Sequence, residues 1–271
     1  MMKQLARLQF SSFGIKVPDQ APQMNVPKTF ADAFKDDEKS ASPDPTVPPL
    51  FIADSTNKYH CDVQKQKTKD YGGYIDGICD AICSAWSQWQ SAATLVGVMV
   101  NAVTASGGQV VGPPLQPLIL ATAPKAGPSQ LKYSNVISQV IGTAWLQYQS
   151  SIKVPGLPWY PAFAAMALPV APPMPNIPVP VAALTQVTVP VSKDVLKGQM
   201  IAQFADPGAP HHKELFDCIA DAFEKCFQIW QTSTMVTNVL GTGPVPTFAP
   251  PIVPAGPVVG GVANMPPGGF A

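Results

Sequence analysis

Residues 85–91 read AWSQWQS, and this stretch decides the fold because the chain repeats it twice. It returns as AWLQYQS at 144–150 and as CFQIWQT at 226–232. The match extends upstream without gaps as far as Asp76 in the first copy, where the other copies have Asn135 and Asp217. A repeat of this kind indicates that one structural unit is used three times in the chain.

The apolar residues of each copy have helical spacing. In the first copy they are Ile75, Ile78, Ile82, Trp86 and Trp89, which step by 3, 4, 4 and 3 positions, so they share one face of an α-helix. The sequence therefore predicts three amphipathic helices of roughly 16 to 20 residues. Each apolar face ends in two bulky aromatics, which bury about 150–250 Å² each. One helix cannot cover such a face alone, so the three pack together or against helices of other chains.

Each helix leads into a long stretch without Lys, Arg, Asp or Glu, at residues 81–124, 154–192 and 226–271. Proline fixes φ and removes a hydrogen-bond donor, so these stretches favour extended backbone. Their apolar side chains need a surface, and we expect them to pack over neighbouring subunits; the alternative is a flexible low-complexity tail. The predicted fold class is mainly α: three repeated amphipathic helices joined by long Pro/Gly-rich extended segments with little regular β-structure.

The repeat and the distribution of charge predict four segments. They are a charged N-terminal arm at 1–70, repeat 1 at 71–128, repeat 2 at 129–210 and repeat 3 at 211–271. The arm is interpreted as a solvated segment or as one that becomes ordered on a neighbouring subunit. The first twenty residues lack the apolar run of a signal peptide, and the five cysteines do not resemble a disulfide framework. We therefore expect synthesis in a reducing cytoplasm.

The charge balance and the prolines exclude two classes of function. Lys+Arg and Asp+Glu both number 17, so the chain has no excess of positive charge for a phosphate backbone and no nucleic acid is expected as its specific partner. The proline density of the charge-free stretches is incompatible with spanning helices. The apolar run at 92–103 is too short to cross a bilayer. No membrane span is expected.

Several polar groups are candidates for sites of chemistry. Cys79 and Cys83, with His60-Cys61 and His211-His212, supply zinc-type ligands, but no Cys-x-x-Cys pair is present and buried structural thiols are the simpler interpretation. No histidine lies in a nucleophile motif, and the glycine-rich pieces lack a P-loop lysine. Four aspartates at helical spacing are expected to face solvent: Asp76, Asp80, Asp217 and Asp221. We predict no enzyme activity, no cofactor, and no catalytic, cofactor-binding or metal-binding residues.

The residues expected to matter are those of packing and assembly. The glutamine after the second aromatic is identical in all three copies, and its amide can satisfy carbonyl groups where the helix turns into its tail. Two phenylalanines of the last tail are expected to anchor it at a subunit contact. The predicted packing and assembly residues are Trp86, Trp89, Gln90, Trp145, Tyr148, Gln149, Phe227, Trp230, Gln231, Phe248 and Phe270.

The Trp-Gln-Ser, Tyr-Gln-Ser and Trp-Gln-Thr motifs, each followed by a charge-free and usually proline-rich tail, resemble structural proteins of tailed-phage and contractile-injection gene clusters. The resemblance covers residues 75–124, 133–180 and 215–271. It implies a non-enzymatic structural subunit in a virion or virion-like particle, with copies of itself and other structural subunits as partners. The alternatives are a monomeric adaptor that binds one partner protein and a membrane-associated secretion or pore component.

Overall fold

The computed structural model describes residues 1–13, 52–187, 189–209, 211–250 and 254–271, with backbone alone for most of 52–68. The chain forms two compact units, of which the larger comprises Met1–Phe10 and Ile75–Ala271 and the smaller comprises Ser11–Tyr74. The four segments expected from the sequence are thus not the compact units. In the smaller unit the described structure is the end of one helix and the first part of another.

The larger unit contains long and short helices. The long helices are α3 (Ile52–Ala92, of which the part from Ile75 belongs here), α5 (Pro128–Ser151) and α7 (His212–Ser233). The short ones are α1 (Met2–Ser12), α4 (Leu115–Thr122) and α6 (Lys193–Phe204). The long helices end at positions that are equivalent in the repeat, namely Ala92, Ser151 and Ser233.

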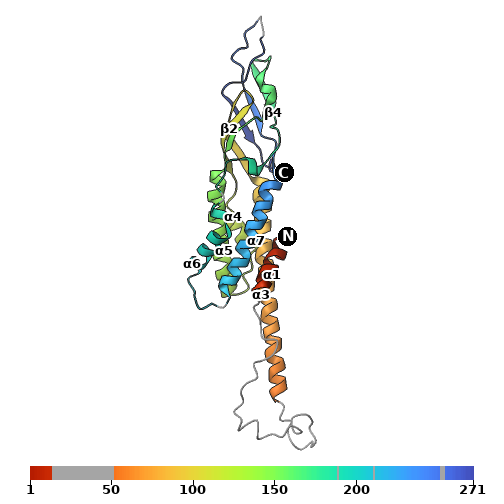
Figure 1. The fold of residues 1–271 in the computed structure, drawn as a ribbon, viewed down its shortest axis with the longest axis vertical. Coiled ribbons are helices and arrows are strands. Elements are labelled where there is room, and N and C mark those ends of the chain that lie inside the picture. The colour runs from red at the N-terminus through yellow and green to blue at the C-terminus, as the bar shows by residue number, and fades with distance from the viewer. Residues whose placement is uncertain (14–51, 188, 210, 251–253) are drawn as a thin grey trace, which may run out of the picture. The chain divides into compact units, whose positions relative to one another are not determined.

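Each short helix precedes a long helix in the chain and packs against it, which gives three helix pairs (Figure 1). Each short helix, or the segment directly after it, also contacts a second long helix. Gln9 of α1 reaches α7, and the segment that follows α4 meets α3 where Pro124 lies against Gly77. α6 stacks Phe204 on Tyr133 of α5. The helices are thus linked by contacts of α1 with α3 and α7, of α6 with α7 and α5, and of α4 with α5, and the residues after α4 reach α3.

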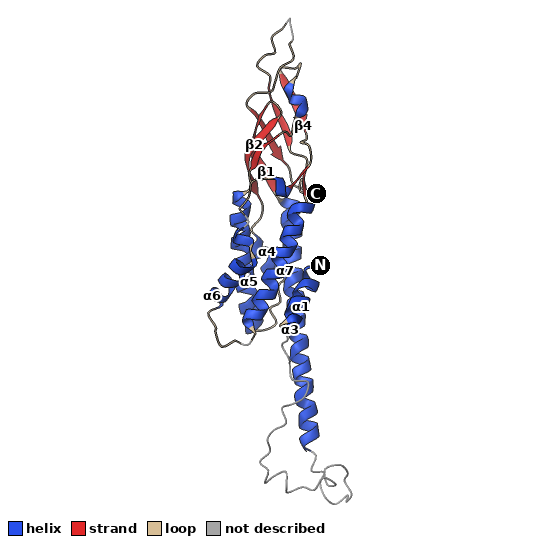
Figure 2. Cartoon of the chain, viewed as in Figure 1, coloured by secondary structure: helices blue, strands red, loops and turns tan. Residues whose placement is uncertain are grey.

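The segments after the helices form strands. They are β1 (Thr94–Asn101), β2 (Thr104–Val111), β3 (Val154–Leu157), β4 (Val170–Met174), β5 (Val179–Pro180), β6 (Met235–Val236), β7 (Leu240–Pro244) and β8 (Gly261–Met265). Six of them make an antiparallel sheet in the order β3-β2-β1-β8-β7-β4, and β5 pairs with β6. Figure 2 shows the strands gathered where the long helices end. Short 3-10 turns lie at Pro161–Ala164, Val181–Ala183 and Val189–Val191.

The prediction of a mainly α fold with little regular β-structure is wrong. The charge-free segments of the three repeats pair with one another: β1 from repeat 1 pairs with β8 from repeat 3, and β2 pairs with β3 from repeat 2. An unpaired backbone in an apolar stretch loses its hydrogen bonds to water, and pairing replaces them. The prolines do not prevent this, because in the six-stranded sheet they lie in the edge strands β3 and β4 and at the last residue of β7.

One face of the sheet belongs to the core. Leu95, Val98 and Val100 of β1 and Ala263 of β8 are buried. The connection after β3 covers part of this region: the ring of Tyr160 lies against Gly241 of β7, and its hydroxyl donates to the carbonyl of Val239. The outward-facing residues of the same strands are exposed, so within the described part of the chain the second face is open.

Candidate functional site

The aromatic residues that end the three helix faces meet in one cluster inside the chain. Trp86 of α3 lies 4.7 Å from Trp145 of α5 and 6.3 Å from Phe227 of α7, measured between ring centroids. The second aromatic of each repeat joins them, since Trp89 lies 4.6 Å from Trp145 and Tyr148 lies 4.7 Å from Phe227. Tilted and edge-on pairs of this kind add to the energy of burial. The cluster therefore holds the three long helices to one another.

Five of the six aromatics expected to be buried are so, and the sixth is not. Trp86 is the most exposed of the five at 9%, whereas Trp230 is half-buried. Trp230 lies 5.6 Å from Trp86 and 5.5 Å from Trp145, on the open side of the cluster.

The three repeated glutamines link the helices in a ring of hydrogen bonds. Trp89 Nε1 of repeat 1 donates to Gln149 Oε1 of repeat 2 over 2.7 Å. Gln231 Nε2 of repeat 3 donates to the Tyr148 hydroxyl of repeat 2 over 3.3 Å. The ring closes where Trp230 Nε1 donates to Gln90 Oε1 of repeat 1 over 3.1 Å. Gln149 and Gln231 are thus each paired with the second aromatic of the preceding repeat, Gln90 is paired with that of the last repeat, and we call this arrangement the glutamine ring.

The glutamine ring also holds the segments that follow the helices. Gln90 Nε2 donates to the carbonyl of Phe270, and the Phe270 ring stacks on Trp89 at 5.7 Å. Gln231 Nε2 and the Tyr148 hydroxyl both donate to Gln186 Oε1. Burial raises the pKa of Tyr148, so its phenol stays protonated and keeps donating at neutral pH. Gln90 thus donates to a backbone carbonyl of an extended segment, but of the repeat-3 tail and not of the tail that follows its own helix, and Gln231 donates to a side chain. The bonds to aromatics of other repeats were not expected from the sequence.

The two phenylalanines of the last tail have different surroundings. Phe270 is 4% exposed and belongs to the aromatic cluster. Phe248 is half-buried in a turn after β7, where its N–H donates to the carbonyl of Val245. Their role at a subunit contact stays a prediction.

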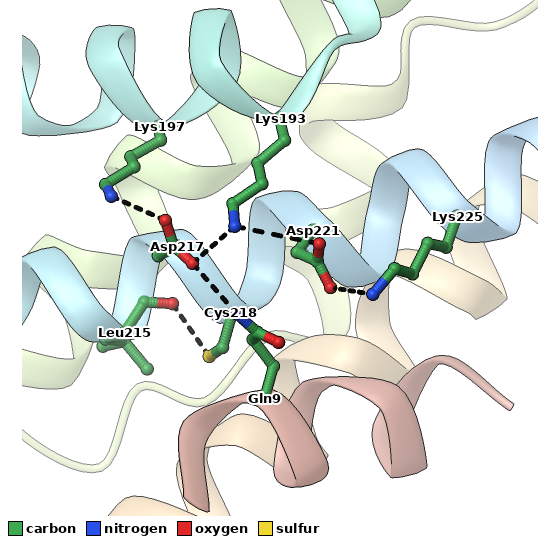
Figure 3. A network of polar contacts seen from close by, with 8 residues as sticks. All are labelled: Gln9, Lys193, Lys197, Leu215, Asp217, Cys218, Asp221 and Lys225. Carbon is green, nitrogen blue, oxygen red and sulfur yellow. Dashed lines mark hydrogen bonds and ion pairs between the residues drawn. The ribbon is translucent and has the colours of Figure 1, made fainter. Parts of the chain in front are cut away.

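A second polar site joins α1, α6 and α7 around Asp217 (Figure 3). Asp217 is only 4% exposed and receives Lys197 Nζ at 2.6 Å and Lys193 Nζ at 2.9 Å. Gln9 Nε2 donates to the same carboxylate over 3.4 Å. Asp221, one turn further, pairs with Lys225 at 2.7 Å. We call this group the repeat-3 ion cluster.

The pKa of Asp217 is lowered in spite of its burial. Removal from water favours the neutral acid and raises the pKa, but the hydrogen bonds from Lys197 and Lys193 outweigh it. The carboxylate is therefore ionised at neutral pH and paired with both lysines. The expectation that all four repeated aspartates face solvent is wrong for Asp217 and Asp221, because α6 lies over them.

Repeat 1 carries the same arrangement in a more exposed form. Arg7 of α1 donates to both oxygens of Asp76 at 2.9 and 2.7 Å, and Lys3 lies 2.7 Å from Asp80. The hydrogen bond from Arg7 lowers the pKa of Asp76. Asp76 and Asp80 align with Asp217 and Asp221, so two cations spaced by four residues on a short helix meet two anions spaced by four on a long helix.

Repeat 2 has no such charges. Its aligned residues are Asn135 and Gln139. Instead, Gly142 of α5 allows a close approach of α4, since a Cβ at this position would lie 2.8 Å from the Cβ of Gln116. The sequence analysis did not predict the short helices. A signal was present, because Lys3/Arg7 and Lys193/Lys197 are each four residues apart, which is also the spacing of the aspartates that they pair with.

The interpretation of the cysteines as buried structural thiols does not hold for all of the described ones, because Cys83 is exposed and Cys226 is half-buried. Cys79 and Cys218 are buried, and burial raises the pKa of the Cys79 thiol to about 12. A thiol with so high a pKa is protonated at neutral pH and is a poor nucleophile. Among the described residues, no three His, Cys, Asp or Glu side chains gather as metal ligands do. The side chains of His60 and Cys61 lie outside the described residues.

A hollow of about 520 Å³ lies beside the sheet. Its lining comes from β1, β2, the last turn of α5 and the residues just after α5, and consists of Val96, Gly97, Gly108, Gln109, Ser150 and Lys153. Lys153 supplies its single charged group, which by itself does not define a reaction.

Comparison with protein-family models, with curated proteins and with solved structures found no match. In the described part of the chain, no helix has the length and apolar content needed to cross a bilayer.

Proposed function

We propose that the chain is a non-enzymatic structural subunit of a large protein assembly, of the virion or phage-tail kind, whose partners are copies of itself and other structural subunits. The proposal is supported by the uncovered face of the six-stranded sheet. There, Met99 of β1 is 57% exposed and lies directly opposite Val262 of β8, which is 53% exposed.

Two further apolar residues extend this surface across three strands. Val96 of β1 is exposed on the same side, because a register shift lies between Leu95 and Val98. Leu240 of β7 is exposed opposite Asn264. We call Val96, Met99, Leu240 and Val262 the sheet patch. Exposed apolar residues gathered on one face of a sheet are typical of an interaction site in soluble proteins.

The edges of the sheet favour contact through its face. Edge strand β3 contains Pro155, and edge strand β4 contains Pro172 and Pro173. Proline has no N–H to donate, so these edges resist the addition of a further strand. The charge-free tails thus contribute to assembly by forming the sheet patch. A balanced net charge offers little electrostatic opposition to such association.

The polar residues of the repeat support a structural role as well. In the described structure, the glutamine ring and the two sets of ion pairs bind one helix to another. These residues bond to other residues of the same chain, as expected of residues that stabilise the fold of a subunit.

Size-exclusion chromatography with light scattering tests the proposal. The wild type should elute as a defined oligomer far above the mass of one chain, 28.6 kDa. The variant M99K/V262K should dissociate it without a large change in melting temperature, because both side chains are already exposed. The matched control is L146K/I229K, which adds the same charge to two exposed apolar residues of α5 and α7.

The outcomes separate the proposal from its alternatives. A wild-type monomer would overturn it in favour of an adaptor, and an oligomer that exists only with detergent would favour a membrane-associated component. Dissociation by L146K/I229K but not by M99K/V262K would place the contact on the helices.

A further inference from the structure

The three helix pairs differ in the length of the chain that joins their members. The connection comprises residues 123–127 between α4 and α5 and residues 205–211 between α6 and α7. Between α1 and α3 it comprises residues 13–51, which is 39 residues. Five to seven residues are therefore enough to dock a short helix on its own long helix.

The longer helix of repeat 1 explains only part of this excess. α3 begins at Ile52, about 17 residues before the position that aligns with the start of α5. That extension adds about 25 Å of helix, which an extended chain covers with roughly eight residues. A chain of 39 residues reaches up to about 130 Å, a distance that includes neighbouring subunits of an assembly.

The contact made by α1 is also the weaker of the two charged ones. α1 buries Met2 and Ala6, whereas α6 buries Leu196, Met200 and Phe204. The side chains of the Lys3–Asp80 and Arg7–Asp76 pairs are 38–59% exposed, and exposed ion pairs contribute little to stability. The docking of a weakly held helix on a long connection depends on the effective concentration of its docking site. In an assembly, a neighbouring copy can supply that site, as the chain itself can.

We propose that α1 is exchanged between copies of this chain, so that α1 of one copy docks between α3 and α7 of the next. The docked helix makes the contacts described above: Lys3 with Asp80, Arg7 with Asp76, Gln9 with Asp217, and Met2 beside Cys83, where the sulfur atoms lie 3.9 Å apart. This inference rests on the proposed function, because exchange needs copies that assemble.

A disulfide test separates exchange from docking within one chain. The variant M2C places a thiol beside Cys83, and mild oxidation with copper phenanthroline links the two. Exchange predicts covalent dimers and longer chains on a non-reducing gel. The control M2C/C83S should lose these products. A product that remains monomeric and runs faster than the reduced chain would overturn exchange.

A mixing test uses folded chains without oxidation. K3E/R7E reverses the charges of α1, and D76R/D80K reverses the charges of its docking site. Each variant alone has therefore lost the ion pairs of the contact. With exchange, the intact α1 of D76R/D80K docks on the intact site of K3E/R7E. Mixing should then give mixed oligomers and raise the melting temperature above that of either variant. With docking inside each chain, mixing restores nothing, and that result overturns the proposal.

The repeat-3 ion cluster supplies the matched control. α6 is joined to α7 by residues 205–211 alone, so K193E/K197E mixed with D217K/D221K should show no rescue. An oligomer that assembles normally but fails both tests would refute exchange and leave the proposed function standing. A wild type that is monomeric at every concentration would refute both.

Discussion

Replacement of Asp217 by asparagine (D217N) tests whether the repeat-3 ion cluster stabilises the fold. Asparagine keeps the shape but leaves Lys193 and Lys197 without their shared anion. Loss of one partner from a buried pair costs about 3–5 kcal/mol. The lysine side chains are 27% and 34% exposed, so water relieves part of this cost. We expect D217N to lower the free energy of unfolding by about 2–3 kcal/mol.

The aligned substitution D76N is the matched control. The side chains of Asp76 and Arg7 are 38% and 47% exposed, and an exposed pair of this kind contributes about 0–1 kcal/mol. For a chain of this size, 1 kcal/mol shifts the melting temperature by about 2–4 °C. D217N should therefore melt about 4–12 °C below the wild type, and D76N within about 4 °C of it.

Urea unfolding followed by circular dichroism, at low salt and at 1 M NaCl, measures both effects. Salt screens the exposed pair more than the buried one, so the D76N effect should vanish in high salt while the D217N effect persists. Equal losses in both variants, or a D217N chain as stable as the wild type, would refute the idea that burial under α6 sets the strength of the cluster.

The same variant has a defined pH dependence. The pKa of Asp217 is lower in the folded chain than its ordinary value of about 3.9. The stability that this provides is fully present above the unfolded pKa and is lost as pH falls through the folded one. The difference between wild type and D217N should thus be constant from pH 5 to 8 and shrink below about pH 4.

Three other perturbations probe the core. W145A should lower the free energy of unfolding by about 3–5 kcal/mol. W145F removes fewer buried atoms and should cost less than W145A, because among the described residues the Trp145 indole N–H has no hydrogen-bond partner to lose. Urea titration compares the two variants, and a W145A chain as stable as the wild type would contradict the packed cluster. Q149A deprives the buried Trp89 N–H of its acceptor and should cost about 1–3 kcal/mol, with a red shift of tryptophan fluorescence if water enters. Deletion of residues 261–271 removes β8 from the centre of the sheet, so the near-ultraviolet signal should collapse; a native spectrum would show that the sheet does not need this strand.

The helical part of the fold was accessible from the sequence because its signal is local. The spacing from Ile75 to Trp89 depends only on the 3.6-residue period, and it recurs in α5 and α7. The aligned aromatic positions also predicted which side chains the helices bury. Whether they meet within one chain or between chains was left open, because the periodicity is the same in both cases.

The strands were missed because pairing is a non-local property. Absence of charge and abundance of proline describe extended backbone, and both hold equally for a paired strand and for an unpaired strip. What distinguishes them is the partner: β1 finds β8 some 160 residues away in the chain, and no spacing within either segment encodes that contact. The prolines of β3 and β4 are compatible with a sheet because these strands occupy its edges.

For the polar residues as well, the sequence determined one part and the tertiary structure another. The sequence by itself determined that Asp76, Asp80, Asp217 and Asp221 share one face at helical spacing, and that Gln90, Gln149 and Gln231 are equivalent. Only the tertiary structure decided that Asp217 is buried by α6 while Asp76 stays half-open under α1, and that each glutamine bonds to another repeat. The physical reason is that a residue's place on its own helix follows from the backbone period, whereas its burial and partners depend on which other segment comes to lie over it.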